Sequence, residues 1–182
     1  LLLAAMPIVA RETCFALKGG TAINLFVRDL PRLSVDIDLT YLGDESRDQA
    51  LANAEAAFHR IKDELEKMVG IKTMTSRREG QDNDTKLFVS KGGIQIKIEA
   101  SPVIRGTVLP VQTRGLVKKA VDLFEVEVDT PVVNLGDLYG GKIVAALDRQ
   151  HPRDLFDIKL LFENEGITKD IRTGFITYFM SH

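Results

Sequence analysis

Two aspartates separated by one residue have the greatest potential for chemistry in this sequence. Asp36 and Asp38 lie in the segment 34–40, in which polar residues alternate with aliphatic ones. This period of two is typical of a half-buried strand, so both carboxylates are expected to project from the same face. Carboxylates held about 6 to 7 Å apart along a strand repel each other unless a cation lies between them, and hard divalent ions take oxygen ligands. We therefore predict that Asp36 and Asp38 bind Mg²⁺.

A glycine pair precedes the aspartates. Gly19 and Gly20 follow the apolar run 14–17 and open a helical pattern over 21–28, which predicts a strand-to-helix turn. Glycine lets a phosphate approach the backbone closely, and the start of a helix presents free N–H groups to an anion. Thr21 adds a hydroxyl at the same point. The segment therefore predicts a phosphate-binding turn beside the metal site.

A second alternating segment offers a third carboxylate. Isoleucines at every other position from 94 to 98 predict a strand whose polar face carries Lys97 and Glu99. Glu99 is the expected third metal ligand if this strand lies beside the aspartate strand. A lysine and a glutamate on a solvated sheet face are also commonplace, and that interpretation stays open.

A third group of charged residues lies in the C-terminal part. Lys142 and Arg149 are seven residues apart and share a helix face, and Pro152 breaks the helix before Asp154 and Asp157. Lysine can meet a triphosphate oxygen. The two aspartates can orient Lys142 and Arg149, bind nucleotide or acceptor, or serve as a base, and the spacing does not choose among these roles.

Together these motifs resemble the polymerase-beta-like nucleotidyltransferase superfamily, and within it the AbiEii/AbiGii-type toxin branch. The matching elements are G-G-T-A at 19–22, R-x-S-x-D-x-D-L at 32–39, K-x-E at 97–99, and D-L-x-x-x-K-x-x-A-x-x-x-R-x-x-x-R-D-x-x-D at 137–157. They occur in the family's order and extend over residues 15–162. Three short motifs and one long one in this order are hard to reach by chance.

The resemblance implies an α+β nucleotidyltransferase fold. We expect a mixed, mostly antiparallel sheet flanked by helices, with a small helical C-terminal part. Residues 1–182 are expected to form one domain, in which a catalytic core covers about 13–133 and a helical part covers about 134–182 and contributes to the site.

The resemblance also implies an activity. We expect Mg²⁺-dependent transfer of a nucleoside monophosphate from an NTP to an acceptor hydroxyl of RNA (tRNA) or protein, with one or two metal ions bound by Asp36, Asp38 and Glu99. In the family such enzymes are toxins encoded beside a cognate antitoxin and act in abortive infection against phage. The expected catalytic residues are Asp36, Asp38, Glu99, Lys142 and Asp154, with Glu99 or Asp154 taking the acceptor proton. The expected nucleotide-binding residues are Gly19, Gly20, Thr21, Arg32, Ser34, Lys97, Lys142, Arg149 and Asp157.

Two other functions remain open on the same fold. One is an enzyme that modifies a small molecule such as an aminoglycoside, and the other is an inactive module that binds a nucleotide or a partner. The stretch 103–120 has four basic residues and no acidic one (Arg105, Arg114, Lys118 and Lys119). A basic acceptor groove there favours RNA, whereas an acidic pocket favours a cationic drug. The stretch can equally be a solvated loop and helix face.

The apolar pattern predicts the elements that position these residues. Steps of three and four predict an amphipathic helix over 47–69, and alternation predicts strands at 71–76 and 86–90. The glycines at 92–93 predict a hairpin turn into the strand that carries Glu99.

Further elements are expected nearer the C-terminus. A strand is expected over 124–133, with a turn at 130–131, before a helix capped by Asn134 or Asp137. Residues 160–162 are expected to close the core.

Composition narrows the class of protein. With 182 residues, 45% of them hydrophobic, the chain suffices for one compact domain, and a net charge of −2 excludes a global attraction to nucleic acid. A single cysteine, Cys14, excludes an intramolecular disulfide. No apolar run approaches the ~20 residues needed to span a bilayer, so we expect a cytoplasmic protein without a membrane partner. The chain begins with Leu1 rather than Met, so its natural ends can lie outside this sequence.

Overall fold

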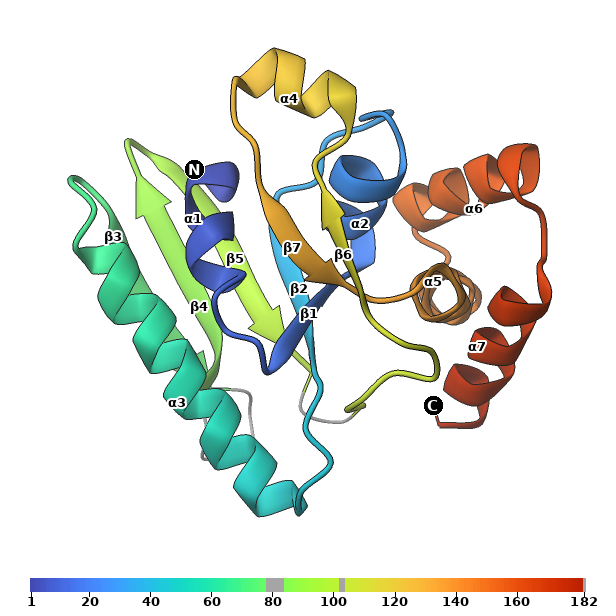
Figure 1. Ribbon diagram of the computed structural model, residues 1–182, viewed down its shortest axis with the longest axis horizontal. Helices are drawn as coiled ribbons and strands as arrows, with labels where there is room; N and C mark the ends of the chain where they lie inside the picture. Colours follow the sequence, from blue (N-terminus) through green and yellow to red (C-terminus); the bar gives the residue numbers. More distant parts are fainter. Residues whose placement is uncertain (78–83, 102–103, 182) are drawn as a thin grey trace.

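The computed structural model describes residues 1–77, 84–101 and 104–181. In these ranges seven strands form one mixed sheet with the order β3-β4-β5-β2-β1-β7-β6 (Figure 1). The strands are β1 Phe15–Lys18, β2 Asp36–Tyr41, β3 Lys72–Arg77, β4 Asp84–Lys91, β5 Ile94–Ala100, β6 Gln112–Gly115 and β7 Asp129–Val132. The β1/β7 and β2/β5 pairs are parallel and the other four pairs are antiparallel. The expected mixed, mostly antiparallel sheet is confirmed.

Helices cover the sheet and extend beyond one side of it. The helical elements are α1 Leu2–Val9, α2 Gly19–Ala22, the π-helix η1 Ile23–Val27, α3 Arg47–Glu66, α4 Lys118–Phe124, α5 Leu135–Arg149, α6 Pro152–Asn164 and α7 Lys169–Met180. In Figure 1, α1 and α3 lie across the half of the sheet that holds β3, β4 and β5, whereas α5, α6 and α7 gather on the opposite side of the molecule. No helix in the described ranges combines the length and the apolar character that a bilayer span requires.

The hydrophobic core covers one face of the sheet, and the polar side chains of β2 and β5 project from the other. Ile37 of β2 and Ile98 of β5 are fully buried, as is Phe58 of α3, and burying such a side chain stabilises the fold by roughly 1.5–3 kcal/mol. Because neighbouring residues of a strand point to opposite faces, burial of these isoleucines turns the alternate residues to the other face. That face carries Asp36 and Asp38.

Most elements agree with the sequence pattern, with small shifts at their ends. The helix expected over 47–69 is α3, which begins at Arg47 and ends at Glu66. The hairpin turn is present, since Gly92 and Gly93 join β4 to β5 with φ of 58° and 80°. Positive φ is a conformation that glycine adopts without strain.

The strand expected over 124–133 is wrong in two respects. Phe124 ends α4 and Glu125 has φ 51°, so the strand begins only at Asp129. The expected turn at 130–131 lies inside β7, where Pro131 is paired in register with Thr113 of β6. Proline lacks an N–H but fits the extended backbone, so it is tolerated where no ladder bond is required of it. Strand β6 was not predicted, because its polar residues show no alternation.

The C-terminal helices also modify the expected core. Asn134 caps α5 by accepting a hydrogen bond from the Gly136 N–H at 3.0 Å, as expected. Leu161 is fully buried, but Phe162 is 61% exposed, so the expectation that it closes the core is wrong. Helix α7 packs so tightly on α5 that a Cβ on Gly140 would lie 2.5 Å from the backbone of Gly174.

Candidate active site

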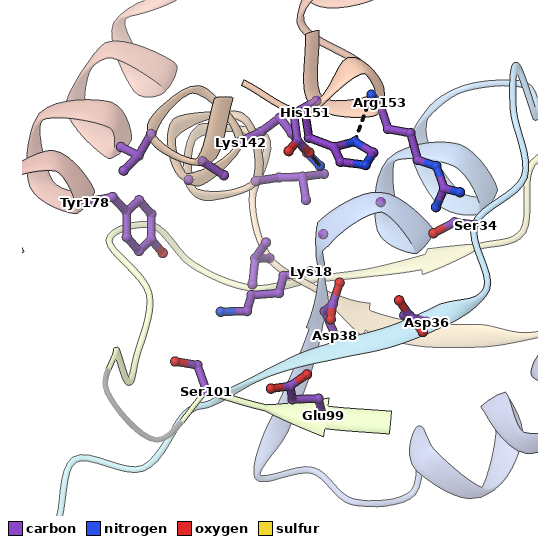
Figure 2. Close-up of a pocket in the computed structure, with 18 of the residues that line it drawn as sticks. Lys18, Ser34, Asp36, Asp38, Glu99, Ser101, Lys142, His151, Arg153 and Tyr178 are labelled. Carbon is purple, nitrogen blue, oxygen red and sulfur yellow. Dashed lines mark hydrogen bonds and ion pairs between the residues drawn. The ribbon is translucent and has the colours of Figure 1, made fainter. Parts of the chain in front are cut away.

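A row of charged side chains crosses three adjacent strands. Lys18, the last residue of β1, lies opposite Asp38 of β2, and Asp38 lies opposite Glu99 of β5. Two residues earlier in β2, Asp36 lies opposite Lys97 of β5. Residues paired in register project from the same face, so the sheet brings Asp36, Asp38 and Glu99 to one face, as Figure 2 shows.

Burial and neighbouring charges both act on the carboxylate of Asp38. Burial raises the pKa of Asp38 above its ordinary value, and repulsion by Asp36 and Glu99 adds to the rise against the attraction of Lys97 and Lys18. A divalent cation would relieve both the repulsion and the loss of hydration. Asp36 and Asp38 are oxygen donors of the kind that Mg²⁺ prefers, so the chemistry of this pair fits the ion.

Glu99 is held differently from the two aspartates. Its Oε2 lies 2.7 Å from Nζ of Lys97 and its Oε1 lies 3.5 Å from Nζ of Lys86. Burial acts to raise the pKa of Glu99, but the two lysines hold it below its ordinary value. Among the residues that the structure describes, no three His, Cys, Asp or Glu side chains are arranged to hold a metal ion. The three carboxylates expected at the metal thus share one face without forming a ready set of ligands.

The glycine turn packs directly against the aspartates and the loop before them. Gly19 has φ 73°, and a Cβ there would collide with Oδ2 of Asp38. A Cβ on Gly20 would lie 2.9 Å from Nη2 of Arg32 and 3.0 Å from Oγ of Ser34. Only glycine allows β1 to pass into α2 this close to the carboxylates.

Thr21 helps to hold the glycine turn against β2. Its hydroxyl donates a hydrogen bond to the backbone carbonyl of Asp36, and its side chain is fully buried. Nearby, Nδ2 of Asn24 donates to the carbonyl of Gly20 at 2.8 Å. The Thr21 bond ties the start of α2 to β2 and the Asn24 bond ties η1 to α2, so the Thr21 hydroxyl donates its proton within the protein and helps to position the turn.

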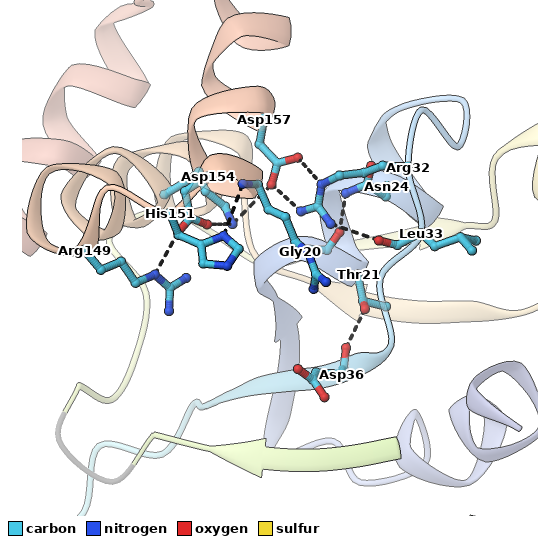
Figure 3. Close-up of polar contacts among 12 residues, drawn as sticks. Gly20, Thr21, Asn24, Arg32, Leu33, Asp36, Arg149, His151, Asp154 and Asp157 are labelled. Atoms are coloured by element: carbon cyan, nitrogen blue, oxygen red, sulfur yellow. Dashed lines mark hydrogen bonds and ion pairs between the residues drawn. The ribbon is translucent and has the colours of Figure 1, made fainter. Parts of the chain in front are cut away.

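Two buried aspartates of α6 collect three basic side chains (Figure 3). Nζ of Lys142 lies 2.8 Å from Oδ1 of Asp154 and 3.2 Å from Oδ2 of Asp157. Nε of Arg149 lies 2.7 Å from Oδ2 of Asp154. Arg32, from the loop before β2, donates from Nε and Nη2 to the two oxygens of Asp157 at 2.8 and 2.6 Å. The network joins α5, α6 and the loop that leads to the aspartates.

The network matches one of the roles that the spacing left open, in which the two aspartates orient Lys142 and Arg149. Both oxygens of Asp154 accept hydrogen bonds, and although burial acts to raise its pKa, the bonds from Arg149 and Lys142 hold the pKa below its ordinary value. Lys142 is only 7% exposed and lies between two carboxylates, so its charge is already compensated.

These elements enclose a cavity of about 580 Å³, which is in the range of small-molecule sites. Of the expected site residues, Gly19, Gly20, Arg32, Ser34, Asp36, Asp38, Lys97, Glu99, Lys142, Arg149 and Asp154 line it. Thr21 and Asp157 do not line the cavity, but they bond to residues that do, Asp36 and Arg32. The basic side chains of the stretch 103–120 are also absent from its lining, so that stretch does not form a basic wall of this cavity.

Sequence reasoning missed several side chains of the cavity wall, among them two cations and a tyrosine. Lys18 and Arg153 both line it, and so does Tyr178 of α7. Lys18 directly precedes the glycine pair and Arg153 precedes Asp154, so their places in the motifs were a usable signal. Tyr178 carries no such signal, because nothing in the sequence brings α7 to the sheet.

Asp137 closes one end of the cavity by holding three donors. It accepts hydrogen bonds from the N–H groups of Val108 and Leu109 at 2.7 and 2.9 Å, and from the Tyr178 hydroxyl at 2.6 Å. Burial raises the pKa of Tyr178, and the Asp137 charge raises it further. Asp137 therefore links the segment before β6 to α5 and α7, whereas the sequence suggested only a helix cap.

Comparison with known families identifies one match. The family described as "Nucleotidyl transferase AbiEii toxin, Type IV TA system" matches residues 1–182. A comparison with curated proteins found no match.

Solved structures share the fold at low sequence identity. MenT4, a nucleotidyltransferase toxin from Mycobacterium tuberculosis H37Rv, is 13% identical with a TM-score of 0.73, over 98% of this chain and 62% of MenT4. A protein from H. pylori proposed to be a nucleotidyltransferase is 18% identical (TM-score 0.56, 90% of this chain and 66% of that one), and JHP933 from Helicobacter pylori is 19% identical (0.54, 90% and 64%). The chain spans less than two thirds of the length of each of these proteins. These likenesses confirm the expected fold.

Proposed function

The chain belongs to the AbiEii family of nucleotidyl transferase toxins of type IV toxin–antitoxin systems, and on this premise we propose that it transfers a nucleoside monophosphate from an NTP to an acceptor hydroxyl. The observation that carries the proposal is the packing of the Gly19–Gly20 turn against Asp38 in a cavity large enough for a nucleotide. A turn that admits phosphate beside a pair of carboxylates is the arrangement that phosphoryl transfer requires.

The carboxylates supply the metal chemistry. Asp36 and Asp38 would hold Mg²⁺, which when bound neutralises phosphate charge and stabilises the attacking and leaving oxygens. Gly19 and Gly20 let the turn pack directly against Asp38 and Arg32, where a Cβ would collide with them. Glu99 lies opposite Asp38 and would join the site by exchanging its lysine partners for the ion.

Glu99 is the better of the two expected proton acceptors. Its side chain is 22% exposed, so an acceptor hydroxyl can reach it in the cavity. Asp154 is only 4% exposed and both of its oxygens are occupied by Lys142 and Arg149. A general base must come within hydrogen-bond reach of the proton that it takes. Both carboxylates are ion-paired to basic side chains, so their exposure decides between them, and we assign the proton to Glu99 and the clamping of α5 to Asp154.

The charge of the cavity bears on the acceptor. Six of the described lining side chains are Lys or Arg and six are Asp or Glu. A site for a cationic drug would need an acidic excess, which this lining does not have. The lining therefore does not favour an aminoglycoside. By family membership we propose that the acceptor is an RNA hydroxyl and that the protein acts as a cytoplasmic toxin with a cognate antitoxin in phage defence.

Radiolabel transfer tests the proposal. The protein is incubated with Mg²⁺, total cellular RNA and each of the four α-³²P-labelled NTPs in turn, and labelled RNA is resolved on a denaturing gel. We expect label with at least one NTP, and none with Asp36→Asn or with EDTA. Wild-type labelling no greater than that of Asp36→Asn for all four NTPs would contradict the proposal.

A further inference from the structure

The basic side chains of the cavity fall into two groups. Six described Lys and Arg side chains line it, and four of these are ion-paired to carboxylates of the same chain. The paired side chains are those of Arg32, Lys97, Lys142 and Arg149. The other two are Lys18 and Arg153, for which no side-chain hydrogen bond or ion pair occurs with any described residue.

The paired group has little charge left for a ligand. Arg32 meets both oxygens of Asp157, and Lys142 lies between Asp154 and Asp157. An incoming phosphate would have to compete with carboxylates that are already buried and hydrogen-bonded. Breaking such a pair leaves an uncompensated buried charge, which is strongly unfavourable. These side chains therefore serve to hold α6 against α5 and the loop before β2.

Lys18 and Arg153 are placed where an anion would need them. Lys18 is partly buried at the end of β1 and reaches into the cavity from the floor, and Arg153 extends over it from the first turn of α6 (Figure 2). In that view Asp38 lies beside Lys18, and Asp36 lies below the guanidinium of Arg153. The backbone N–H of Arg153 donates to Nδ1 of the capping His151 at 3.2 Å, so this contact does not involve the guanidinium.

We infer that Lys18 and Arg153 are the side chains that bind the phosphates of the nucleotide, Lys18 on the side of Asp38 and Arg153 on the side of Asp36. The identity of the anion as a polyphosphate rests on the proposed function. An unpaired ammonium or guanidinium gains most from a new charge-assisted hydrogen bond, because no existing pair must be broken first. Two cations near a metal-binding carboxylate pair suit a linear polyanion that carries the metal with it.

Binding of inorganic tripolyphosphate with Mg²⁺, measured by isothermal titration calorimetry, tests the inference without any transfer reaction. We expect Lys18→Met and Arg153→Gln each to weaken binding roughly ten- to a hundredfold, as the loss of a charge-assisted contact predicts. Lys18→Arg should retain part of the affinity, because it keeps the charge in a different geometry. Lys18→Gln is the second variant should Lys18→Met fail to fold.

Two matched controls carry the same substitutions away from the cavity. Lys159→Met removes an exposed lysine of α6 and Arg172→Gln removes an exposed arginine of α7, and both should bind tripolyphosphate as the wild type does. Binding by Lys18→Met and Arg153→Gln within twofold of the wild type, or no binding by the wild type, would overturn the inference.

The outcome separates this inference from the proposed function. Labelled RNA from the wild type together with undiminished tripolyphosphate binding by both variants would leave the transfer activity standing and refute the phosphate contacts. Tripolyphosphate binding that depends on Lys18 and Arg153, without labelled product for any NTP, would support the contacts and refute the transfer.

Discussion

Arg32 and Asp157 are 125 residues apart in sequence and form a two-point ion pair, with Nε and Nη2 of Arg32 at 2.8 and 2.6 Å from the two carboxylate oxygens. Arg32 also lies against Gly20, where a Cβ would come within 2.9 Å of its guanidinium. The position of the glycine turn thus depends on helix α6, although α6 belongs to the C-terminal part of the chain.

Breaking this pair should destabilise the protein strongly. The Asp157 side chain is fully buried and that of Arg32 is 16% exposed, so Arg32→Gln leaves a carboxylate buried with less compensation. We expect a loss of about 3–5 kcal/mol in the free energy of unfolding, measured by urea denaturation. The control is Lys159→Gln, which breaks the exposed Lys159–Glu163 pair of α6 and should cost under about 1 kcal/mol. Equal losses for both variants would contradict a buried clamp.

Asp38→Asn should separate metal binding from folding. The pKa of Asp38 is raised in the folded protein, so its ionisation opposes folding at neutral pH. Without metal, we expect the variant to melt above the wild type at pH 7. The difference should shrink as the pH falls through the raised pKa of Asp38, because the wild-type carboxyl then becomes protonated and loses its charge.

Magnesium should reverse the order of these two proteins. Added Mg²⁺ is expected to raise the melting temperature of the wild type and leave Asp38→Asn unchanged, since only the wild type has both carboxylates of the pair. Transfer should fall roughly hundredfold or more, because metal stabilisation of the transition state is worth several kcal/mol. A variant that unfolds outright at pH 7 would show instead that Asp38 is structural.

Lys142→Met tests a residue for which the sequence motif and the observed ion pairs suggest different roles. The sequence suggested that Lys142 meets the triphosphate, in which case its removal should weaken binding and leave the melting temperature almost unchanged. Its place between Asp154 and Asp157 leads us to expect the opposite, a loss of about 3–5 kcal/mol in stability. Differential scanning fluorimetry and tripolyphosphate titration, both below the melting temperature, distinguish the two. Normal stability with weakened binding would restore the original role.

Tyr178→Phe tests the closure of the cavity by α7. The substitution removes one of three donors to Asp137 without changing the ring, and a hydrogen bond to a charged group is worth about 1.5–3 kcal/mol. We expect that loss in stability, together with faster hydrogen exchange at the amides of Val108 and Leu109, which share the same carboxylate. Unchanged exchange at both amides would mean that Asp137 holds this segment independently of α7.

The sequence by itself determined the local parts of the site. Alternation in 34–40 and 94–99 put Asp36, Asp38 and Glu99 on the polar faces of their strands, because a strand has only two faces. His151 and Pro152 likewise mark the break between α5 and α6, since proline disfavours the helical conformation of the residue before it and fits the first turn of a new helix. Such features follow from a few neighbouring residues and need no tertiary information.

Only the tertiary structure decided which charges meet. Pairing of β1 with β2 set Lys18 opposite Asp38. Docking of α6 formed the ion pairs of Asp157 with Arg32 and of Asp154 with Lys142. The same basic residues could equally have faced a phosphate, because helical spacing fixes a shared face but not the partner on the other side of it. Strand order, helix docking and the resulting burial fix that partner. The sequence therefore identified most charged residues of this cavity, while the fold separated the four cations held in ion pairs from Lys18 and Arg153, which form none with a described residue.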